Sequence, residues 1–466
     1  MTMHTDVAVI GSGFSAVALS LNLLELLPAT AKVSLVGSAS GQGRGLAYST
    51  QADCHLLNVP AGRMSLFVDR PGHFVQWLRE NGYRATDEDF VPRRVYGDYV
   101  ADCLAAARKR TANRPALTLV DAEALSAQTM QDGGLLFTLS SGELLASRMA
   151  ALCTGAGTRR LPLEAISEEV RSRIVHDPWA DAWWQRLPPE SDVLFVGTGL
   201  TMVDQCLLLK RQGFRGTMHA LSRHGLLPRA HLDRRARPVE AALVPGEGGV
   251  SHMLAVLRAQ AENSADWRAV MDGLRPLTQD LWKAWSPRQR SRFLRHAAAF
   301  WNAHRHRMAP AVACEIAALR TAGQLVVHRG RLDGLRRTGE GVAADIGGRA
   351  SEAIQAAMVV NCTGFDRCTV EASPLLASLA ARGMLRSDPH GLGIAVDDRS
   401  AVLPAAGESD GCLYALGPLT AGRHWEITAV PDIRAQARSV AQAINASLST
   451  LSLLASSCRE RTRHVL

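Results

Sequence analysis

Val7-Ala-Val-Ile-Gly-Ser-Gly-Phe-Ser-Ala16 is the stretch that decides the fold of this chain. Its first four residues are apolar, and so short a run is typical of a buried strand in a parallel sheet. The run ends at Gly11-x-Gly13-x-x-Ala16, after which apolar residues recur at helical spacing as far as Leu27. A strand, a glycine turn and a helix in this order are the fingerprint of a dinucleotide-binding unit.

Each small residue of this turn has a physical role beside a pyrophosphate. Gly11 permits the tight turn, Gly13 lets the backbone approach the phosphates, and Ala16 lets the helix pack closely on the strand. Unpaired N–H groups and the positive end of the helix dipole then face the anion. We therefore expect these three residues to bind a first dinucleotide.

The chain repeats this pattern over Val193-Leu-Phe-Val-Gly-Thr-Gly-Leu-Thr-Met202-Val-Asp204. A short apolar strand again precedes the turn, and a helix is expected over Gln205 to Lys210. Met202 occupies the third small position and is poor for close contact between helix and strand. Two such turns predict two dinucleotide sites; the alternative is two Rossmann-like halves of which only one binds a ligand. The residues expected at the second site are Gly197, Gly199 and Thr201.

The end of the next strand selects the cofactor because it faces the ribose. After the second turn, this strand ends at Ser222 and is followed by Arg223. A guanidinium binds phosphate through paired hydrogen bonds, so Arg223, with Ser222 as a second donor, favours NADPH over NADH. After the first turn, the equivalent place is Gly37-Ser38, without an acid. A ribose partner there must come from the backbone, from Ser38, or not at all.

Length and composition bound the fold class. A chain of 466 residues suits two or three domains, and 47% hydrophobic residues are enough for a buried core. We find no basic start followed by an apolar plug, and the longest apolar candidate, Ala16 to Leu27, is interrupted by polar residues. These features predict a cytoplasmic protein that does not bind a membrane.

The nine cysteines form no Cys-x-x-Cys pair, which argues against zinc ribbons, clusters and disulfide frameworks. The spacing therefore predicts no metal site. It also excludes the redox disulfide that flavin disulfide reductases carry beside the flavin. Cys153 and Cys362 fall in apolar strands, so we expect both to be buried.

The net charge of +8 is spread among acids. Its densest basic groups, residues 234–237 and 304–307, lie in no nucleic-acid motif, and only 5% of residues are aromatic. We therefore expect no nucleic-acid partner. Steering of an anionic cofactor accounts for the charge more simply.

The segments between the two turns suggest how the chain is divided. Glycines make Gly41 to Ser49 a loop, in which Arg44 offers a guanidinium to the first cofactor's phosphates or is a solvated charge. Apolar strands end in Thr-Gly at Thr154-Gly155 and again at Thr363-Gly364. This repetition suggests crossings between two domains near residues 156 and 362, unless the two strand ends are unrelated. The predicted domains are 1–160 with 360–466, and 161–359.

A helical insert is predicted over about 250–320, inside the second domain. It carries four tryptophans, at positions 267, 282, 285 and 301. Together they could line or cover a substrate pocket. The alternative is that they form the core of the insert.

The stretch Leu413 to Arg434 contains a strand that ends at Gly417, a loop with His424 and Glu426, and a helix expected to begin near Thr428. Both loop side chains titrate, so we predict that they shuttle protons. Alternatively, Glu426 caps the helix. In a flavin fold, the N-terminus of this helix could stabilise negative charge on the reduced flavin.

An ordered series of sequence blocks resembles the bacterial FAD-NAD(P)-binding protein family, which is similar in plan to class B flavin monooxygenases and N-hydroxylases. The blocks are Gly11-Ser-Gly-Phe-Ser15, Gly43-Arg-Gly-Leu-Ala-Tyr48, His55-Leu-Leu-Asn-Val-Pro60, Gly197-Thr-Gly-Leu-Thr-Met-Val-Asp204, Ser222-Arg-His-Gly-Leu-Leu-Pro228, Asn361-Cys-Thr-Gly364 and Ala415-Leu-Gly-Pro418. The resemblance implies FAD at the first turn, held by Gly11, Gly13, Ser15 and the Arg44 loop, and NADPH at the second. Within these blocks, Asn58 and Gly417 are further cofactor-binding candidates.

From this resemblance we expect an α/β protein with two Rossmann-like domains and an FAD- and NADPH-dependent oxidoreductase activity. The expected reaction is oxygenation of a small organic substrate, for which the flavin supplies the chemistry and the protein supplies placement. The alternatives are an NADPH-linked flavin dehydrogenase that does not use oxygen and a non-catalytic dinucleotide-binding protein. A homodimer is a candidate assembly.

Overall fold

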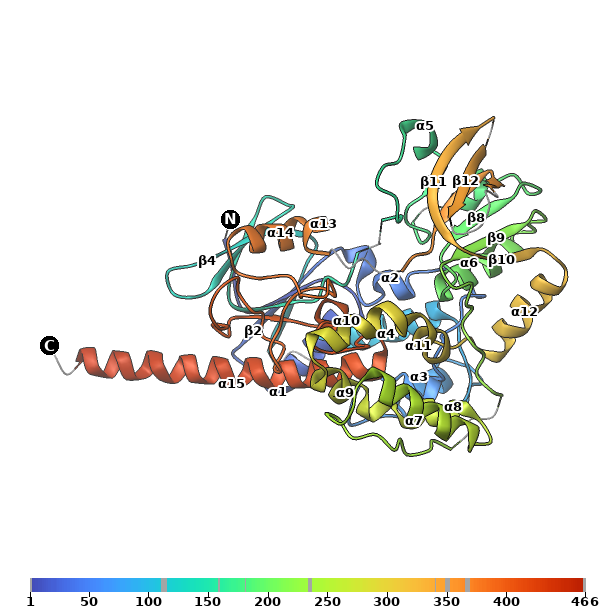
Figure 1. Cartoon of the computed structure of the whole chain (residues 1–466). Helices are drawn as coiled ribbons and strands as arrows, with labels where there is room; N and C mark the ends of the chain where they lie inside the picture. Colours follow the sequence, from blue (N-terminus) through green and yellow to red (C-terminus); the bar gives the residue numbers. More distant parts are fainter. Residues whose placement is uncertain are drawn as a thin grey trace.

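The computed structural model describes residues 2–109, 115–157, 160–180, 182–233, 237–339, 341–347, 353–364 and 369–463 (Figure 1). A mixed sheet and an all-parallel sheet, each covered by helices, lie side by side, and a group of short helices packs below them in this view. The predicted α/β fold with two Rossmann-like halves is confirmed.

The first sheet has the order β3-β2-β1-β6-β5-β4, and β15 also pairs with β6. Its parallel strands are β1 (Thr2–Ile10), β2 (Lys32–Val36), β3 (Ala116–Val120), β6 (Leu144–Leu152) and β15 (Leu413–Ala415). The antiparallel strands β4 (Ala124–Thr129) and β5 (Leu135–Leu139) pair along the first part of β6. Val7 and Val9 are fully buried in β1, as the apolar run predicts.

Three long helices cover one face of this sheet: α1 (Phe14–Leu26), α4 (Arg93–Lys109) and α15 (Val430–Arg463). α15 lies beside α1, although the two are far apart in sequence (Figure 1). On the other face, α14 (Pro374–Ala381) packs against β4. Shorter helices connect these elements: α2 (Gly45–Tyr48), α3 (His73–Glu80) and α13 (Thr369–Ala372).

The second sheet is entirely parallel, with the order β10-β9-β8-β14-β7. Its strands are β7 (Ile174–Val175), β8 (Val193–Val196), β9 (Met218–Ser222), β10 (Leu325–Arg329) and β14 (Met358–Asn361). The helices α6 (Leu200–Arg211) and α12 (Pro310–Thr321) pack on one face, and the antiparallel sheet of β11 (Arg331–Thr338), β12 (Gly341–Gly347) and β13 (Ala353–Ala356) covers the other. The short helix α5 (Glu168–Arg171) lies beside β11. All strands of the second sheet lie between β6 and β15 in sequence, so the chain leaves the first sheet once and returns once.

The helical segment differs from the prediction at its end. Its helices are α7 (Val250–Glu262), α8 (Trp267–Gly273), α9 (Thr278–Ala284), α10 (Pro287–His296) and α11 (Ala298–Arg305). The next helix, α12, packs on α6 and β10 as the crossover into β10. The insert therefore ends before Pro310, because Val312, Ile316 and Leu319 belong to the core of the second half.

Two helices begin at other residues than the sequence predicts. The helix after the second turn begins at Leu200 rather than Gln205, and the final helix begins at Val430 rather than near Thr428. In the second turn Met202 is fully buried, with its sulfur 3.3 Å from the sulfur of Cys206. The bulky third position is thus accommodated within the core.

Candidate functional site: two glycine turns and the junction between them

The two glycine turns have the same geometry. Gly11 and Gly197 have φ values of 129° and 117°, which L residues with side chains rarely adopt. A Cβ atom would lie 2.3 Å from the carbonyl oxygen of Cys153 at Gly11, and 2.1 Å from that of Cys362 at Gly197. Each turn therefore packs directly on the end of a neighbouring strand, β6 or β14. Both cysteines are buried, as predicted.

Each turn opens a helix whose first N–H groups have no side-chain cap. Gly13 is the N-cap of α1 and Gly199 is the N-cap of α6, and neither cap involves a side chain. A Cβ atom at Gly199 would meet nothing within 4 Å. Thr201 follows in the first turn of α6 and is half-buried, whereas Ala16 is fully buried in α1. These open helix N-termini suit anionic pyrophosphates.

Two distant segments close the first turn. The Cα atom of Gly13 lies 3.0 Å from where a Cβ atom of Gly45 would be, so the first residue of α2 lies directly against it. On the other side, a Cβ atom at Gly417 would lie 2.6 Å from Oγ of Ser15. The structure thus brings Ser15 and Gly417 together, although they are some four hundred residues apart in sequence. Any side chain at position 417 would collide with the Ser15 hydroxyl.

Arg44 forms an ion pair, an arrangement that neither sequence-based alternative described. Its guanidinium lies 2.5 Å from Oδ1 of Asp98 on α4, and its side chain is 26% exposed. The pair fixes the loop that faces Gly13. Arg44 therefore lies beside the first turn with part of its charge already neutralised.

The lack of an acid at Gly37 has a steric cause. A Cβ atom there would lie 2.8 Å from the Cβ atom of Ser12, so no side chain fits. Ser38 is exposed at the end of β2. An acid reaches this turn from the adjacent strand instead, because Oδ1 of Asp121 accepts a hydrogen bond from Ala39 N at 2.8 Å. Sequence reasoning missed Asp121, since only the parallel pairing of β2 with β3 brings it here.

A buried ion pair joins the two halves. Arg93 on α4 lies 2.9 Å from Oδ2 of Asp204 on α6, without the alignment of a hydrogen bond. Burial raises the pKa of Asp204 to about 6, although the Arg93 charge opposes this. The ring of His55 bridges the same junction, with Nε2 3.0 Å from the carbonyl oxygen of Asp204. Sequence reasoning overlooked this pair because its partners are distant in the chain.

Asn58 lies close to this junction. Its carbonyl oxygen is 3.1 Å from Nε2 of His231, which follows β9 in the second half. Burial lowers the pKa of His231 to about 4, with Arg307 as a second cause. Asn58 is therefore held where the two halves meet.

At the second turn, the hydroxyl of Ser222 helps to shape the backbone. Ser222 Oγ is hydrogen-bonded to Thr198 Oγ1 at 2.9 Å, and it accepts from Gly225 N at 3.1 Å. Arg223 follows as an exposed residue at the end of β9. The pairing of β8 with β9 brings the end of β9 to the second turn, where Gly197 N donates to Leu221 O at 2.8 Å.

Of the two predicted proton-shuttling residues, His424 is buried, and the side chain of Glu426 is only 6% exposed. Oε1 of Glu426 accepts from Trp301 Nε1 at 2.6 Å and Oε2 accepts from Arg305 Nε at 3.0 Å. The alternative that Glu426 caps the final helix is wrong, since its carboxylate is bound by α11. His424 lies 3.2 Å from Ser400 Oγ, and burial lowers its pKa to about 4. At neutral pH, His424 is a neutral imidazole.

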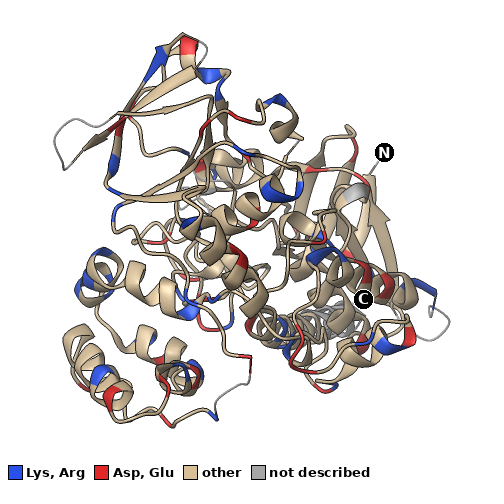
Figure 2. Cartoon of the chain, turned by 90° about the vertical axis from the view of Figure 1, so that its right-hand side faces the viewer, with Lys and Arg blue, Asp and Glu red and all other residues tan. Residues whose placement is uncertain are grey.

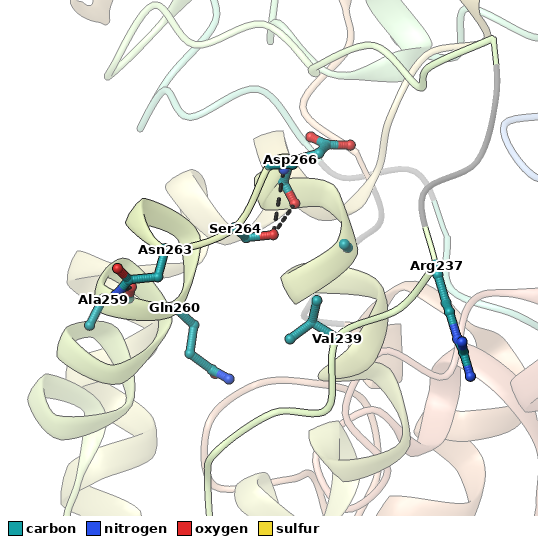
Figure 3. A pocket seen from close by; sticks show the side chains of 9 residues that line it. Arg237, Val239, Ala259, Gln260, Asn263, Ser264 and Asp266 are labelled. Atoms are coloured by element: carbon teal, nitrogen blue, oxygen red, sulfur yellow. Dashed lines mark hydrogen bonds between the residues drawn. The ribbon is translucent and has the colours of Figure 1, made fainter.

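Three of the four tryptophans of the insert belong to a core cluster that extends into the C-terminal loop, whereas Trp267 is half-buried outside this cluster. Trp282 stacks on Trp425 with ring centroids 4.6 Å apart, and its Nε1 donates to Gly422 O at 2.8 Å. Trp285 and Trp301 belong to the same cluster. This arrangement favours the core alternative, and it ties the insert to residues 422–426. A cavity of about 650 Å³ in the insert is lined instead by residues such as Val239, Gln260 and Asn263 (Figure 3).

Basic and acidic residues are interspersed along the ribbon (Figure 2). Residues 234–236 of the first basic group lie outside the described residues. Among the residues that the structure does describe, no group of three or more His, Cys, Asp and Glu is arranged to bind a metal ion. In the same part of the chain, no helix combines the length and the apolar character needed to cross a membrane.

Comparison with known proteins agrees with this geometry. Residues 8–157 match the FAD-NAD(P)-binding family. The first turn, the Arg44 loop, the Asn58 segment and β6 all fall within this range. Three mycobacterial relatives, from Mycobacterium tuberculosis and M. bovis, are uncharacterised and 31% identical over 103 residues, 21% of this chain. The chain spans about a fifth (18%) of the length of these curated relatives.

Solved structures match nearly the whole chain. An ornithine N-hydroxylase of Kutzneria sp. 744 has a TM-score of 0.64 at 17% identity, covering 95% of this chain and 99% of its own. The ornithine hydroxylase of Pseudomonas aeruginosa has the same TM-score at 14% identity, covering 96% and 100%. A cadaverine monooxygenase of Erwinia amylovora has 0.64 at 13% identity, covering 95% of each chain. This chain therefore shares its overall fold with these hydroxylase and monooxygenase structures.

The buried histidines of the site predict a pH-dependent stability. His55, His231 and His424 each have a folded-state pKa of about 4, below the ordinary 6.5, chiefly because burial disfavours the charged ring. The unfolded chain therefore binds more protons between these values, and stability is lost as pH falls from 6.5 towards 4. We expect the thermal midpoint to drop over this window, and His424→Gln to reduce the drop. His296→Gln, on the exposed side of α10, is the control; an unchanged slope in His424→Gln would contradict the assignment.

Proposed function

We propose that this protein is an FAD- and NADPH-dependent flavin monooxygenase that oxygenates a small organic substrate. The observation that carries the proposal is the pair of equivalent glycine turns, one at the carboxyl end of a central strand in each of the two main sheets. The match of the whole chain to N-hydroxylase structures supports the same reading, and so does the family match over residues 8–157.

The residues at the first turn fit FAD. Gly11, Gly13 and Ser15 would face its pyrophosphate at the N-terminus of α1, with Gly417 closing the opposite side. The Arg44 loop would cover the phosphates, and Ser38 lies where the ribose is expected. Asn58 would lie towards the second cofactor. FAD held here would supply a hydride acceptor for the nicotinamide and a group that reacts with oxygen.

The second turn fits NADPH. Gly197, Gly199 and Thr201 would receive its pyrophosphate, and Arg223 the 2′-phosphate, beside Ser222. Within this proposal, domain 161–359 binds NADPH, while 1–160 and 360–466 form the FAD domain.

In the C-terminal loop, His424 is a neutral side chain and Glu426 is a carboxylate in an ion pair. His424 is uncharged at neutral pH, so it would donate or accept a hydrogen bond without adding charge. Glu426 is paired with Arg305 and would position the loop before α15. The N-terminus of α15 would stabilise negative charge on the reduced flavin.

The absorbance spectrum of the purified protein and its rate of oxygen consumption test this proposal. We expect the purified protein to be yellow, NADPH to bleach it, and a panel of small amines to identify one that accelerates oxygen consumption. Bleaching without oxygen consumption would favour the dehydrogenase alternative. A colourless protein that takes up neither FAD nor NADPH would exclude both enzymatic readings.

Cofactor choice gives a separate prediction. Arg223→Ala removes a charged hydrogen bond to the 2′-phosphate, so NADPH binding should weaken by ~1.5–3 kcal/mol while NADH binding changes little. The measurement is the affinity for each nucleotide from flavin-reduction kinetics. Equal losses for both cofactors would refute the role of Arg223.

We further propose that the protein is a homodimer, that it is located in the cytoplasm, and that its substrate is a small molecule. Light scattering of the purified protein and fractionation of cells test these two points.

A further inference from the structure

Hydrogen bonds tie the turn that follows β9 to the second glycine turn, and Arg223 in this turn is exposed. The Thr198 hydroxyl binds both Ser222 Oγ and the carbonyl oxygen of Leu226, the latter at 2.6 Å. Gly225 N closes the turn on Ser222 Oγ. Because Thr198 lies inside the second glycine turn, the loop that carries Arg223 is linked directly to the pyrophosphate position.

A second arginine lies against this turn from the adjacent strand. Arg329 ends β10, and its Cα atom is the register partner of Ser222. A Cβ atom at Gly225 would lie 3.3 Å from the Cβ atom of Arg329, so the Arg329 side chain starts directly beside the turn. Arg223 and Arg329 are both exposed, and neither forms an ion pair with an acid of the described residues. Two uncompensated guanidinium groups on neighbouring strand ends suit a dianionic phosphate.

An aromatic side chain from the insert lies beside the same turn. Phe300 on α11 is 48% exposed, and its ring centroid is 5.3 Å from that of His224, the residue after Arg223. The next residue, Trp301, is bound to Glu426. Helix α11 is therefore fixed on one side to the C-terminal loop while Phe300 faces the turn after β9. An exposed phenyl ring beside a phosphate-binding turn suits a purine, since aromatic rings stack on any base.

We propose, on the basis of the NADPH-dependent function above, that Arg329 is a second ligand of the 2′-phosphate and that Phe300 stacks on the adenine. The insert then takes part in cofactor binding as well as in packing. Specificity for the phosphorylated cofactor arises from two adjacent strands, and affinity for the adenosine arises from α11.

Binding of nucleotide fragments to the purified full-length protein tests the arginine. The probes are 2′,5′-ADP, which carries the 2′-phosphate, and 5′-AMP, which lacks it, measured by calorimetry. We expect Arg329→Met to weaken 2′,5′-ADP about tenfold, as for loss of one charged hydrogen bond, and to leave 5′-AMP unchanged. Arg337→Met, which removes an exposed guanidinium from β11, is the matched control and should change neither.

The outcomes separate this inference from the function on which it rests. Wild-type affinity for 2′,5′-ADP in Arg329→Met would overturn the role of Arg329 while leaving the NADPH function intact. Absence of 2′,5′-ADP binding to the wild-type protein would overturn the NADPH function itself.

The same probes test the aromatic ring. Phe300→Ala should weaken both nucleotides by a similar factor, about tenfold, because adenine is common to them. Phe300→Trp should restore binding. Val244→Ala, which truncates another exposed apolar side chain before the insert helices, is the control. Unchanged affinities in Phe300→Ala would remove Phe300 from the site.

Discussion

Gly197→Ala is expected to leave the protein yellow but unable to bind NADPH, whereas Gly11→Ala is expected to yield protein without flavin. At each position the φ value disfavours an L side chain, and the new methyl group would collide with the carbonyl of Cys362 or Cys153. Overpacking of this kind costs about 1–3 kcal/mol and shifts the backbone. Because the turn positions the N–H groups of the following helix, we expect a shift to abolish binding of the local cofactor only.

Absorbance of the purified variants and NADPH titration measure the two sites separately. Gly72→Ala is the control, since a Cβ atom there meets nothing within 4 Å. If Gly197→Ala lost the flavin and kept NADPH binding, the assignment of cofactors to the two turns would be reversed. If both variants bound both cofactors normally, neither turn would hold a pyrophosphate.

Arg93→Met is expected to destabilise the protein by about 3–5 kcal/mol at neutral pH, because it leaves Asp204 buried without its partner. The side chains of the pair are only 15% and 6% exposed, so solvent compensates little. The double variant Arg93→Met/Asp204→Asn should recover much of this loss, since it removes the buried charge. Urea unfolding measures both.

The pH dependence of this effect has a defined sign. The folded-state pKa of Asp204, about 6, lies above its ordinary 3.8, so the folded state binds more protons between these values. This group therefore lowers stability as pH rises through the window, opposite to the histidines. Without Arg93 the pKa rises further, and the loss of stability should extend to higher pH.

Arg94→Met is the matched control for Arg93→Met. Arg94 is the next residue in α4, and its partner, Asp53, is 68% exposed, so we expect a change below about 1 kcal/mol. Equal losses in the two variants would show that the Arg93–Asp204 pair has no special role.

Local sequence determined the two β–turn–α units. The apolar runs before Gly11 and Gly197, the glycines themselves and the helical spacing after them are all encoded within about a dozen residues. For the same reason, the end of the following strand is readable from the sequence, and the role of Arg223 there stays a prediction. The Thr-Gly strand ends were also visible, although only the structure shows why they recur: each packs against a glycine turn.

The site at the junction was decided by tertiary structure. Glu426 looked like a proton shuttle or a helix cap, but it binds Trp301 and Arg305 from a segment more than a hundred residues away. Asp204 ended the second motif without an assigned role, until α4 placed Arg93 against it. Such pairs leave no periodic signal in the sequence, because a side chain's burial and charge partners depend on how separate elements pack. Turns and strands follow from local backbone preferences, whereas the state of each buried charge follows from its neighbours in space.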